Sequence, residues 1–546
     1  MQEESQGYAK FIRFLVNLPS LGDDSIAIGD DSDSVVIGEA KLRMTELIGT
    51  FDLDPNRCLD LTLDALEAQI RLLIDGSGSG SGSGSTSGSP STAKVYASLR
   101  DAPNQAMTVH VLLHVIQLFP VENVTHLIGF KFSACSTRGV TVAPPPMSLF
   151  LTTGVLASHC LLSLPALQPH LPPLKEIEEG YADWKAAYQK KIKKMGVVSL
   201  NSKTATDAAE DKSGEGKVQN HQLIQLFHVL LEIGLEWDLA VGLFNGSGDK
   251  AKDMIVKCCC VYPPLGLALC DILDQAIAPM YNAKVDNVGS ALCLATTDEE
   301  GELTSSGEHS LLPLDWSKKQ VLELATDLTL VELCTTIEDI MEPIVMSGSM
   351  ASNTVLYTKL CRLVSAMLLE QKTQDGSITE VDEKVLEFLE RVLVSSLSLF
   401  PFNPAIASEL WSVLSLLPYQ LRYALYASWR KHGLEKAALR STIQPPKPLI
   451  QVESMVTTGM ATKYLLKRMS KDNIKDMGRQ ASKIAHNNPL VVFTLMLNQI
   501  ESYDNLILMM VETFKFMGVL SLDVIGYCLL VSLGGEGEGR NKLKGE

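Results

Sequence analysis

The sequence predicts an all-α protein, an elongated and irregular helical solenoid of HEAT-like type with disordered Gly/Ser and charged loops. Hydrophobic residues make up 46% of the 546 residues and aromatic residues only 6%, so the core must consist mainly of aliphatic side chains. Apolar residues recur at intervals of three and four, which places them on one face of a helix. No stretch shows the sustained apolar/polar alternation of a half-buried strand, and no repeat has a fixed period.

The first strongly patterned helix is expected around Leu59, Leu63, Leu66 and Ile70, whose spacing forms one apolar stripe. Charged residues are 20% of the chain, a composition that favours folding over disorder. Further blocks with helical patterning are Gln105 to Gln117, Gln222 to Val241, Lys319 to Met341, Val355 to Glu370 and Asp382 to Leu399.

Composition also predicts how the chain is divided. The Gly/Ser run DGSGSGSGSGSTSGSPST buries little and loses much entropy on ordering, so it is expected to be a flexible linker. The expected segments are an N-terminal helical segment (1–74), the Gly/Ser linker (75–92), a long helical region (93–440), a linker containing QPPKP (441–460), a basic helical segment that continues into further helices (461–533) and a disordered tail (534–546).

No motif in the sequence indicates catalysis, a cofactor or a metal, and we expect none of these. His110 and His114 form HxxxH but lack the Glu of HExxH, so packing is the preferred interpretation. The consecutive thiols of Cys258, Cys259 and Cys260 point in different directions on a helix and are expected to be buried rather than to bind zinc.

Targeting signals are also missing from the sequence. The apolar stretch from Leu506 to Leu530 is interrupted by three charged residues, so no membrane span is expected. The N-terminal MQEESQGYAK is acidic where a signal peptide would be basic and then apolar. We therefore expect a protein of the cytosol or nucleus.

One stretch reverses the sign of an acidic chain whose formal net charge is -17. The basic segment, Ala461 to His486, carries seven Lys or Arg against two Asp, mostly at four-residue steps that would gather them on one side of a helix. These candidate RNA- or partner-binding residues are Lys463, Lys467, Arg468, Lys471, Lys475, Arg479 and Lys483. Directly after them, Asn488 is expected to cap a helix that begins at Pro489.

Three interpretations of the basic segment remain open at this stage. It could be a solvated helix face, a nonspecific contact with RNA phosphates, or a docking face for an acidic partner. Tyr464 is the only aromatic residue among the charges, so recognition of RNA sequence by base stacking is not expected.

The densest group of aromatic residues lies shortly before this segment. It consists of Trp411, Tyr419, Tyr423, Tyr426 and Trp429, and the three tyrosines have helical spacing. This pattern predicts a core or a seam between helices rather than a ligand pocket.

Five stretches, in one order along the chain, resemble the THO complex subunit 2 family, the helical scaffold of the nuclear THO/TREX assembly. They are Leu47 to Glu67, Ser148 to Glu176, Asn220 to Ala240, Phe402 to Gly433 and Tyr464 to Leu530. The resemblance implies that residues 93–440 belong to the N-terminal helical region of that family, and that a HEAT-like middle region begins near Gly478.

The resemblance also implies a function and partners. It implies a noncatalytic scaffold that acts in mRNA processing and in mRNA export coupled to transcription, in the nucleus, with other THO subunits, especially subunit 1. A DEAD-box RNA helicase would be reached through the complex rather than by this chain alone, because the middle region that recruits it stops early here. The alternative is an unrelated helical enzyme or enzyme-regulating domain, which would need a polar constellation that the sequence does not show.

Overall fold

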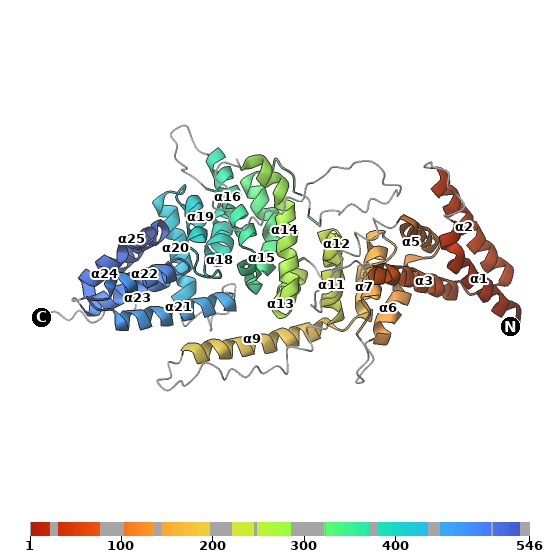
Figure 1. Ribbon diagram of the computed structural model, residues 1–546, viewed down its shortest axis with the longest axis horizontal. Coiled ribbons are helices and arrows are strands. Elements are labelled where there is room, and N and C mark those ends of the chain that lie inside the picture. Colours follow the sequence, from red (N-terminus) through yellow and green to blue (C-terminus); the bar gives the residue numbers. More distant parts are fainter. Residues whose placement is uncertain are drawn as a thin grey trace. The chain divides into compact units, whose positions relative to one another are not determined.

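The structure is a computed structural model that describes residues 2–21, 31–76, 103–135, 144–196, 221–244, 248–285, 321–322, 324–371, 381–434, 448–503 and 506–534. Every regular element in these ranges is a helix, which confirms the predicted all-α class (Figure 1). The chain divides into two compact units. Unit 1 comprises 1–177, 216–254 and 301–322, and unit 2 comprises 178–215, 255–300 and 323–546.

Unit 1 is a stack of helices in which each packs on helices close to it in the chain. Its elements are α1 (Gln2–Leu21), α2 (Asp31–Phe51), α3 (Pro55–Gly76), α5 (Pro103–Ile116), α6 (Val121–Cys135), α7 (Met147–Ser158), α8 (Leu164–Leu167), η1 (Gln168–His170), α11 (Gln222–Glu232), α12 (Trp237–Val241) and η2 (Gly242–Phe244). Helix α3 packs on α1, α5 and α7, and α7 packs on α11. The apolar stripe predicted from Leu59 to Ile70 is buried in this stack.

Unit 2 continues in the same manner. Its elements are α14 (Pro263–Lys284), α15 (Leu330–Ser347), η4 (Ser349–Ser352), α16 (Thr354–Glu370), α17 (Glu383–Phe388), η5 (Leu389–Val394), α18 (Ser395–Leu397), α19 (Pro404–Leu414), α20 (Tyr419–Leu434), α21 (Leu449–Arg468), α22 (Ile474–Ala485), α23 (Pro489–Ser502), α24 (Ile507–Phe514) and α25 (Val519–Leu533). Helices α9 (Leu174–Gly196) and α13 (Gly248–Val261) contribute residues to both units. Contacts run from α14 to α15 and α16, then to α19, and from α19 to α25, the order of an irregular helical solenoid.

Several predicted boundaries need correction. The expected QPPKP linker (441–460) is helical from Leu449 onward, because Pro448 occupies the N-cap position and Gln451 and Met455 face the interior. Within the block expected from Lys319, the described helix is α15, which begins at Leu330 after the N-cap Thr329. The Gly/Ser linker lies outside the described residues beyond the end of α3, and so does the tail from 535 onward.

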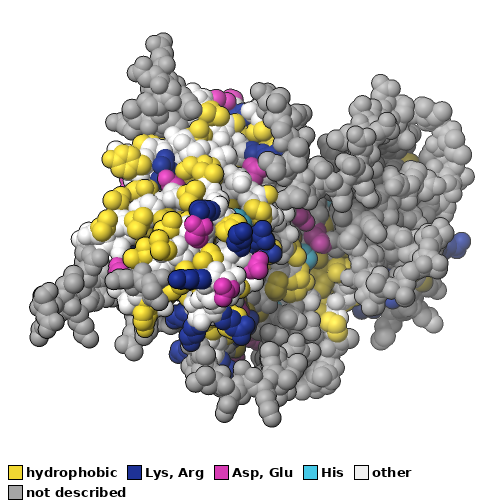
Figure 2. Space-filling model, turned by 60° about the vertical axis from the view of Figure 1, so that its left-hand side comes forward, with side chains coloured by type: hydrophobic (Ala, Val, Ile, Leu, Met, Phe, Trp, Pro, Cys, Tyr) yellow, Lys and Arg dark blue, Asp and Glu magenta, His cyan; other side chains and the backbone are white. Residues whose placement is uncertain are grey.

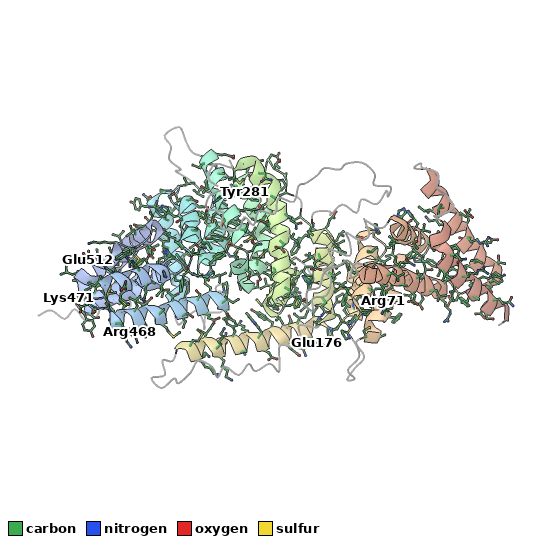
Figure 3. All side chains as sticks on the ribbon, viewed as in Figure 1. Arg71, Glu176, Tyr281, Arg468, Lys471 and Glu512 are labelled. Carbon is green, nitrogen blue, oxygen red and sulfur yellow. The ribbon has the colours of Figure 1, made fainter. Side chains whose placement is uncertain are left out.

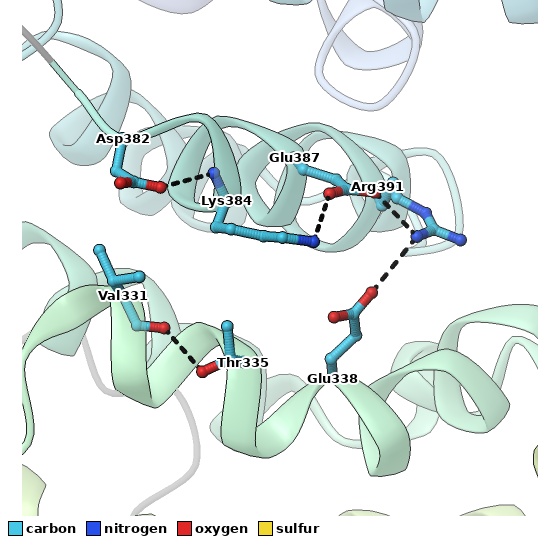
Figure 4. Close-up of polar contacts among 7 residues, drawn as sticks. All are labelled: Val331, Thr335, Glu338, Asp382, Lys384, Glu387 and Arg391. Atoms are coloured by element: carbon cyan, nitrogen blue, oxygen red, sulfur yellow. Dashed lines mark hydrogen bonds and ion pairs between the residues drawn. The ribbon is translucent and has the colours of Figure 1, made fainter. Parts of the chain in front are cut away.

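The start of helix α15 is fixed by hydrogen bonds between side chains and the backbone of its first turn. Thr329 and Glu332 form a reciprocal capping box, in which each side chain accepts a hydrogen bond from the backbone N–H of the other residue. The guanidinium of Arg391 forms an ion pair with Glu338 of α15, at 3.4 Å. It also pairs with Glu387 of α17, at 3.1 Å (Figure 4). These side chains are about two-fifths exposed, so the ion pairs help to orient the helices but contribute little to the free energy of unfolding.

Two members of the aromatic group before the basic segment, Tyr423 and Tyr426, form a seam between α20 and α25 as predicted, whereas Tyr419 is 57% exposed. The rings of Tyr423 and Tyr426 lie 5.6 and 5.8 Å from the ring of Tyr527. A buried ion pair crosses the same seam. Arg422 donates from Nε and Nη2 to the carboxylate of Asp523 at 3.0 and 2.9 Å, and the Tyr426 hydroxyl donates to it at 2.9 Å.

Apolar helices are common in both units. Within the described ranges, no single helix combines the length and the apolar composition that a bilayer span requires. Two pairs of helices meet these criteria only when both members are counted, and each pair is bent by 116°.

Replacing Asp523 with Ala should destabilise unit 2. The substitution leaves Arg422 with the Leu417 carbonyl but without its carboxylate partner, and Tyr426 without its acceptor, in a largely buried place, which typically costs about 3–5 kcal/mol. Urea unfolding followed by circular dichroism measures this cost. The control is Asp476→Ala, whose exposed pair with Arg479 should contribute less than about 1 kcal/mol. Equal stability of the two variants would contradict this account of the seam.

Candidate basic interface

Helix α21 carries the first part of the basic segment. Its buried residues include Thr458, Thr462 and Leu465, and this side packs on α23 and α22. Its last turn ends in Lys467 and Arg468, where positive charge complements the negative end of the helix dipole.

The basic segment is not one continuous helix. This corrects the expectation that the four-residue spacing places all of its charges on one side of a single helix. Helix α21 ends at Arg468, and α22 begins only at Ile474. The side chain of Asn473 holds the turn between them: it donates to the carbonyl of Arg468 at 2.9 Å and accepts from the N–H of Ser470 at 2.8 Å. The repeat of basic residues therefore continues across a turn that breaks the helix.

Helix α22 has one small, buried face and one charged face. A Cβ at Gly478 would lie 2.7 Å from Cδ2 of Phe516, so only glycine permits this approach. One turn later, the hydroxyl of Ser482 donates to the carbonyl of Phe516 at 2.7 Å. This face is fixed on the residues that follow α24, and Lys475, Arg479 and Lys483 lie on the exposed part of the helix.

All seven predicted basic residues are exposed, and we call their side chains the basic surface. The guanidinium of Arg468 lies 4.0 Å from the centre of the Tyr464 ring, and Arg479 lies 3.7 Å from Asp476. The five lysines have no ion-pair partner among the described residues. Figure 3 places Arg468 and Lys471 at the same end of unit 2, and Figure 2 shows Lys and Arg side chains gathered in the lower part of the face it presents. The structure thus exposes all seven residues, on the neighbouring helices α21 and α22 and on the turn between them.

Asn488 has a different role from the predicted one. Helix α23 begins at Pro489 as expected, but the Asn488 side chain makes no capping hydrogen bond. It donates instead to the hydroxyls of Ser454 and Thr458, at 3.1 and 3.0 Å. This contact joins the start of α23 to α21 and helps to fix the basic surface.

The cysteine triplet is buried, as predicted. Cys258, Cys259 and Cys260 are free thiols in α13, and Cys270 is a buried free thiol in α14. Burial raises the pKa of Cys260 and of Cys270 to about 12, so these thiols stay protonated near neutral pH. They behave as small apolar side chains.

His110 and His114 pack against each other in α5, with ring centres 4.5 Å apart. His110 is 1% exposed, and neither of its ring nitrogens has a hydrogen-bond partner among the described residues. Burial, reinforced by the neighbouring rings of His114 and His159, lowers the pKa of His110 from 6.5 to about 4. This histidine is therefore neutral in the folded protein at physiological pH.

The stacked helices of the described residues define an all-α protein of the irregular helical solenoid class. Residues 1–72 and 315–479 match the family described as "THO complex subunit 2 N-terminus", and residues 481–546 match the family described as "Transcription- and export-related complex subunit". The two matches together cover more than half of the chain. The chain belongs to the THO complex subunit 2 family.

Curated relatives agree with this assignment. The chain is 27% identical to THO complex subunit 2 of Arabidopsis thaliana, over 100% of this chain and 27% of the relative. It is 26% identical to THO complex subunit 2 of Mus musculus, over 98% and 29% respectively. The Saccharomyces cerevisiae protein of the same name is 25% identical over 33% of this chain. The chain thus spans less than a third of the length of these plant and mouse relatives.

His110 should make stability depend on pH. Between pH 6.5 and about 4 the unfolded chain binds a proton at this residue while the folded chain does not, so stability falls as the pH falls. Replacing His110 with Leu removes this contribution. The fall in melting temperature between pH 7 and pH 5 should then be smaller than in the unsubstituted protein. An unchanged fall would contradict the neutral, buried state of His110.

Proposed function

We propose that the chain acts as a noncatalytic scaffold in the nuclear THO/TREX complex and supports mRNA processing and mRNA export coupled to transcription. One observation carries this proposal: the chain aligns over 98–100% of its length with proteins named THO complex subunit 2 from plant and mouse. The alignment includes residues 73–314, which lie between the two parts of the first family match. It therefore extends through both compact units.

The helical architecture supports a scaffold role. Each unit is held together by contacts between neighbouring helices, so the interior is used for packing, and the outer faces are available to partners. The buried polar groups at the seam of α20 and α25 are paired with each other. Such a pairing stabilises an interior and leaves no open catalytic arrangement at that place.

The proposed partners are the other THO subunits, above all subunit 1. A DEAD-box RNA helicase would be held by the assembled complex. The basic surface is proposed as a contact site for a polyanion in this setting, because its lysines are exposed and lack ion-pair partners among the described residues.

The proposal predicts that the purified chain and THO subunit 1 form a stable complex of fixed stoichiometry. Co-expression followed by size-exclusion chromatography tests this. The variant in which Lys467, Lys471, Lys475 and Arg479 are all replaced by Glu is the informative comparison, because these side chains lie in solvent and the helices should remain folded. Failure of the unsubstituted chain to bind subunit 1 would contradict the scaffold proposal. Loss of the complex only in the variant would place subunit 1 on the basic surface.

A further inference from the structure

Helix α9 carries a second group of lysines that the sequence pattern did not connect with the basic segment. The helix is acidic in its first half and basic at its end, where Lys190, Lys191, Lys193 and Lys194 follow one another closely. All four are exposed. Lys190, Lys193 and Lys194 have no ion-pair partner among the described residues.

The end of α9 is bound to α21, the helix that carries the first part of the basic surface. The Tyr188 hydroxyl donates a hydrogen bond to the carboxylate of Glu453, and Nζ of Lys191 lies 2.7 Å from the other oxygen of that carboxylate. The Glu453 side chain is 19% exposed. Ile192, the residue after Lys191, is buried. Figure 1 shows the end of α9 beside α21, within unit 2.

The negative charge of Glu453 is thus paired with the positive charge of Lys191. The next lysines along α9 remain free, on a helix that is docked on α21. They extend the positive charge of the basic surface from residues that lie more than 250 positions earlier in the sequence.

We propose that Lys190, Lys193 and Lys194 of α9 and the basic surface of α21 and α22 form one binding surface for the phosphates of single-stranded RNA. The choice of RNA over other single strands rests on the proposed function. The contact itself is with the backbone, because lysine ammonium groups are point charges without a fixed hydrogen-bonding pattern. Tyr464, which is 57% exposed beside Arg468, offers one place for a base to stack.

The composition of the surface favours a polynucleotide over a protein partner. The cores of protein interfaces are depleted in Lys and enriched in apolar and aromatic side chains. Eight of the ten residues proposed here are lysines, and Tyr464 is the one large aromatic side chain exposed among them. A chain with a net charge of -17 would otherwise repel RNA, so a locally positive surface is needed for contact.

The test compares two variants that each lack three positive charges. In the first, Lys190, Lys193 and Lys194 are replaced by Gln; in the matched control, the exposed residues Arg13, Arg71 and Lys250 of unit 1 are replaced by Gln. Binding of a short fluorescent oligouridylate is measured by anisotropy over a range of salt concentrations. The α9 variant should bind roughly tenfold more weakly, and the slope of log K against log salt should fall by about 0.7 for each phosphate that is no longer neutralised. The control should keep both the affinity and the slope of the unsubstituted protein.

A second variant, Glu453→Ala, tests whether α9 must be docked. It removes a negative charge, so simple electrostatics predicts tighter RNA binding, whereas loss of the anchor for Tyr188 and Lys191 predicts weaker binding. The proposal requires the weaker result, with helicity by circular dichroism unchanged. Tighter binding would overturn the shared surface.

Other outcomes are equally decisive. Absence of RNA binding by the unsubstituted chain at low salt, or equal behaviour of the α9 variant and its control, would overturn the proposal. Unchanged RNA binding with loss of the subunit 1 complex would make the surface a protein interface instead. Single-stranded DNA of matching sequence should bind as RNA does, since the contact is mainly with phosphates and a base of either strand can stack on Tyr464. The scaffold proposal fails separately, when the unsubstituted chain does not bind subunit 1.

Discussion

The close contact between α22 and Phe516 is the constraint on which the exposure of the basic surface depends. Gly478 leaves no room for a side chain there, and Ser482 bonds to the Phe516 carbonyl one turn later. Beside that buried face, Lys475, Arg479 and Lys483 are exposed, and the Arg479 guanidinium lies 5.9 Å from the centre of the Phe516 ring. A charged face that has no ion-pair partners for its lysines within the described chain is suited to an external partner.

A second set of polar contacts fixes the neighbouring helices. Asn488 joins α23 to α21, and Glu453 joins α21 to the end of α9. These contacts connect residues far apart in the sequence, from 188 to 488, into one part of unit 2. The position of the positive charge is therefore determined by tertiary packing, although each charge is visible in the sequence.

Much of the fold could be predicted because the buried face of a helix requires apolar residues at intervals of three and four. The stripe from Leu59 to Ile70 and the seam of Tyr423 and Tyr426 both occupy the places that their spacing indicates. The boundaries were harder. The sequence QPPKP predicts a linker that includes Leu449 to Met460. Pro448, however, is compatible with the start of a helix, and Gln451 and Met455 in that helix are buried.

The candidate site was only partly predictable. The seven basic residues were found from charge alone, and the structure exposes all of them, but the break at Asn473 depends on side-chain bonds that periodicity does not reveal. The lysines of α9 were missed because nothing in the local pattern connects them to α21. The run of four lysines within five residues, 190–194, at the end of a helix was the available signal.

Lysine footprinting tests the central claim most directly. The free chain and its complex with oligouridylate are treated with an acetylating reagent, and the modified lysines are identified by mass spectrometry. A single phosphate-binding surface predicts that Lys190, Lys193 and Lys194 become protected together with Lys467, Lys471 and Lys475, while Lys250 of unit 1 reacts as before. Protection of only one of the two groups, or equal protection of Lys250, would contradict the account.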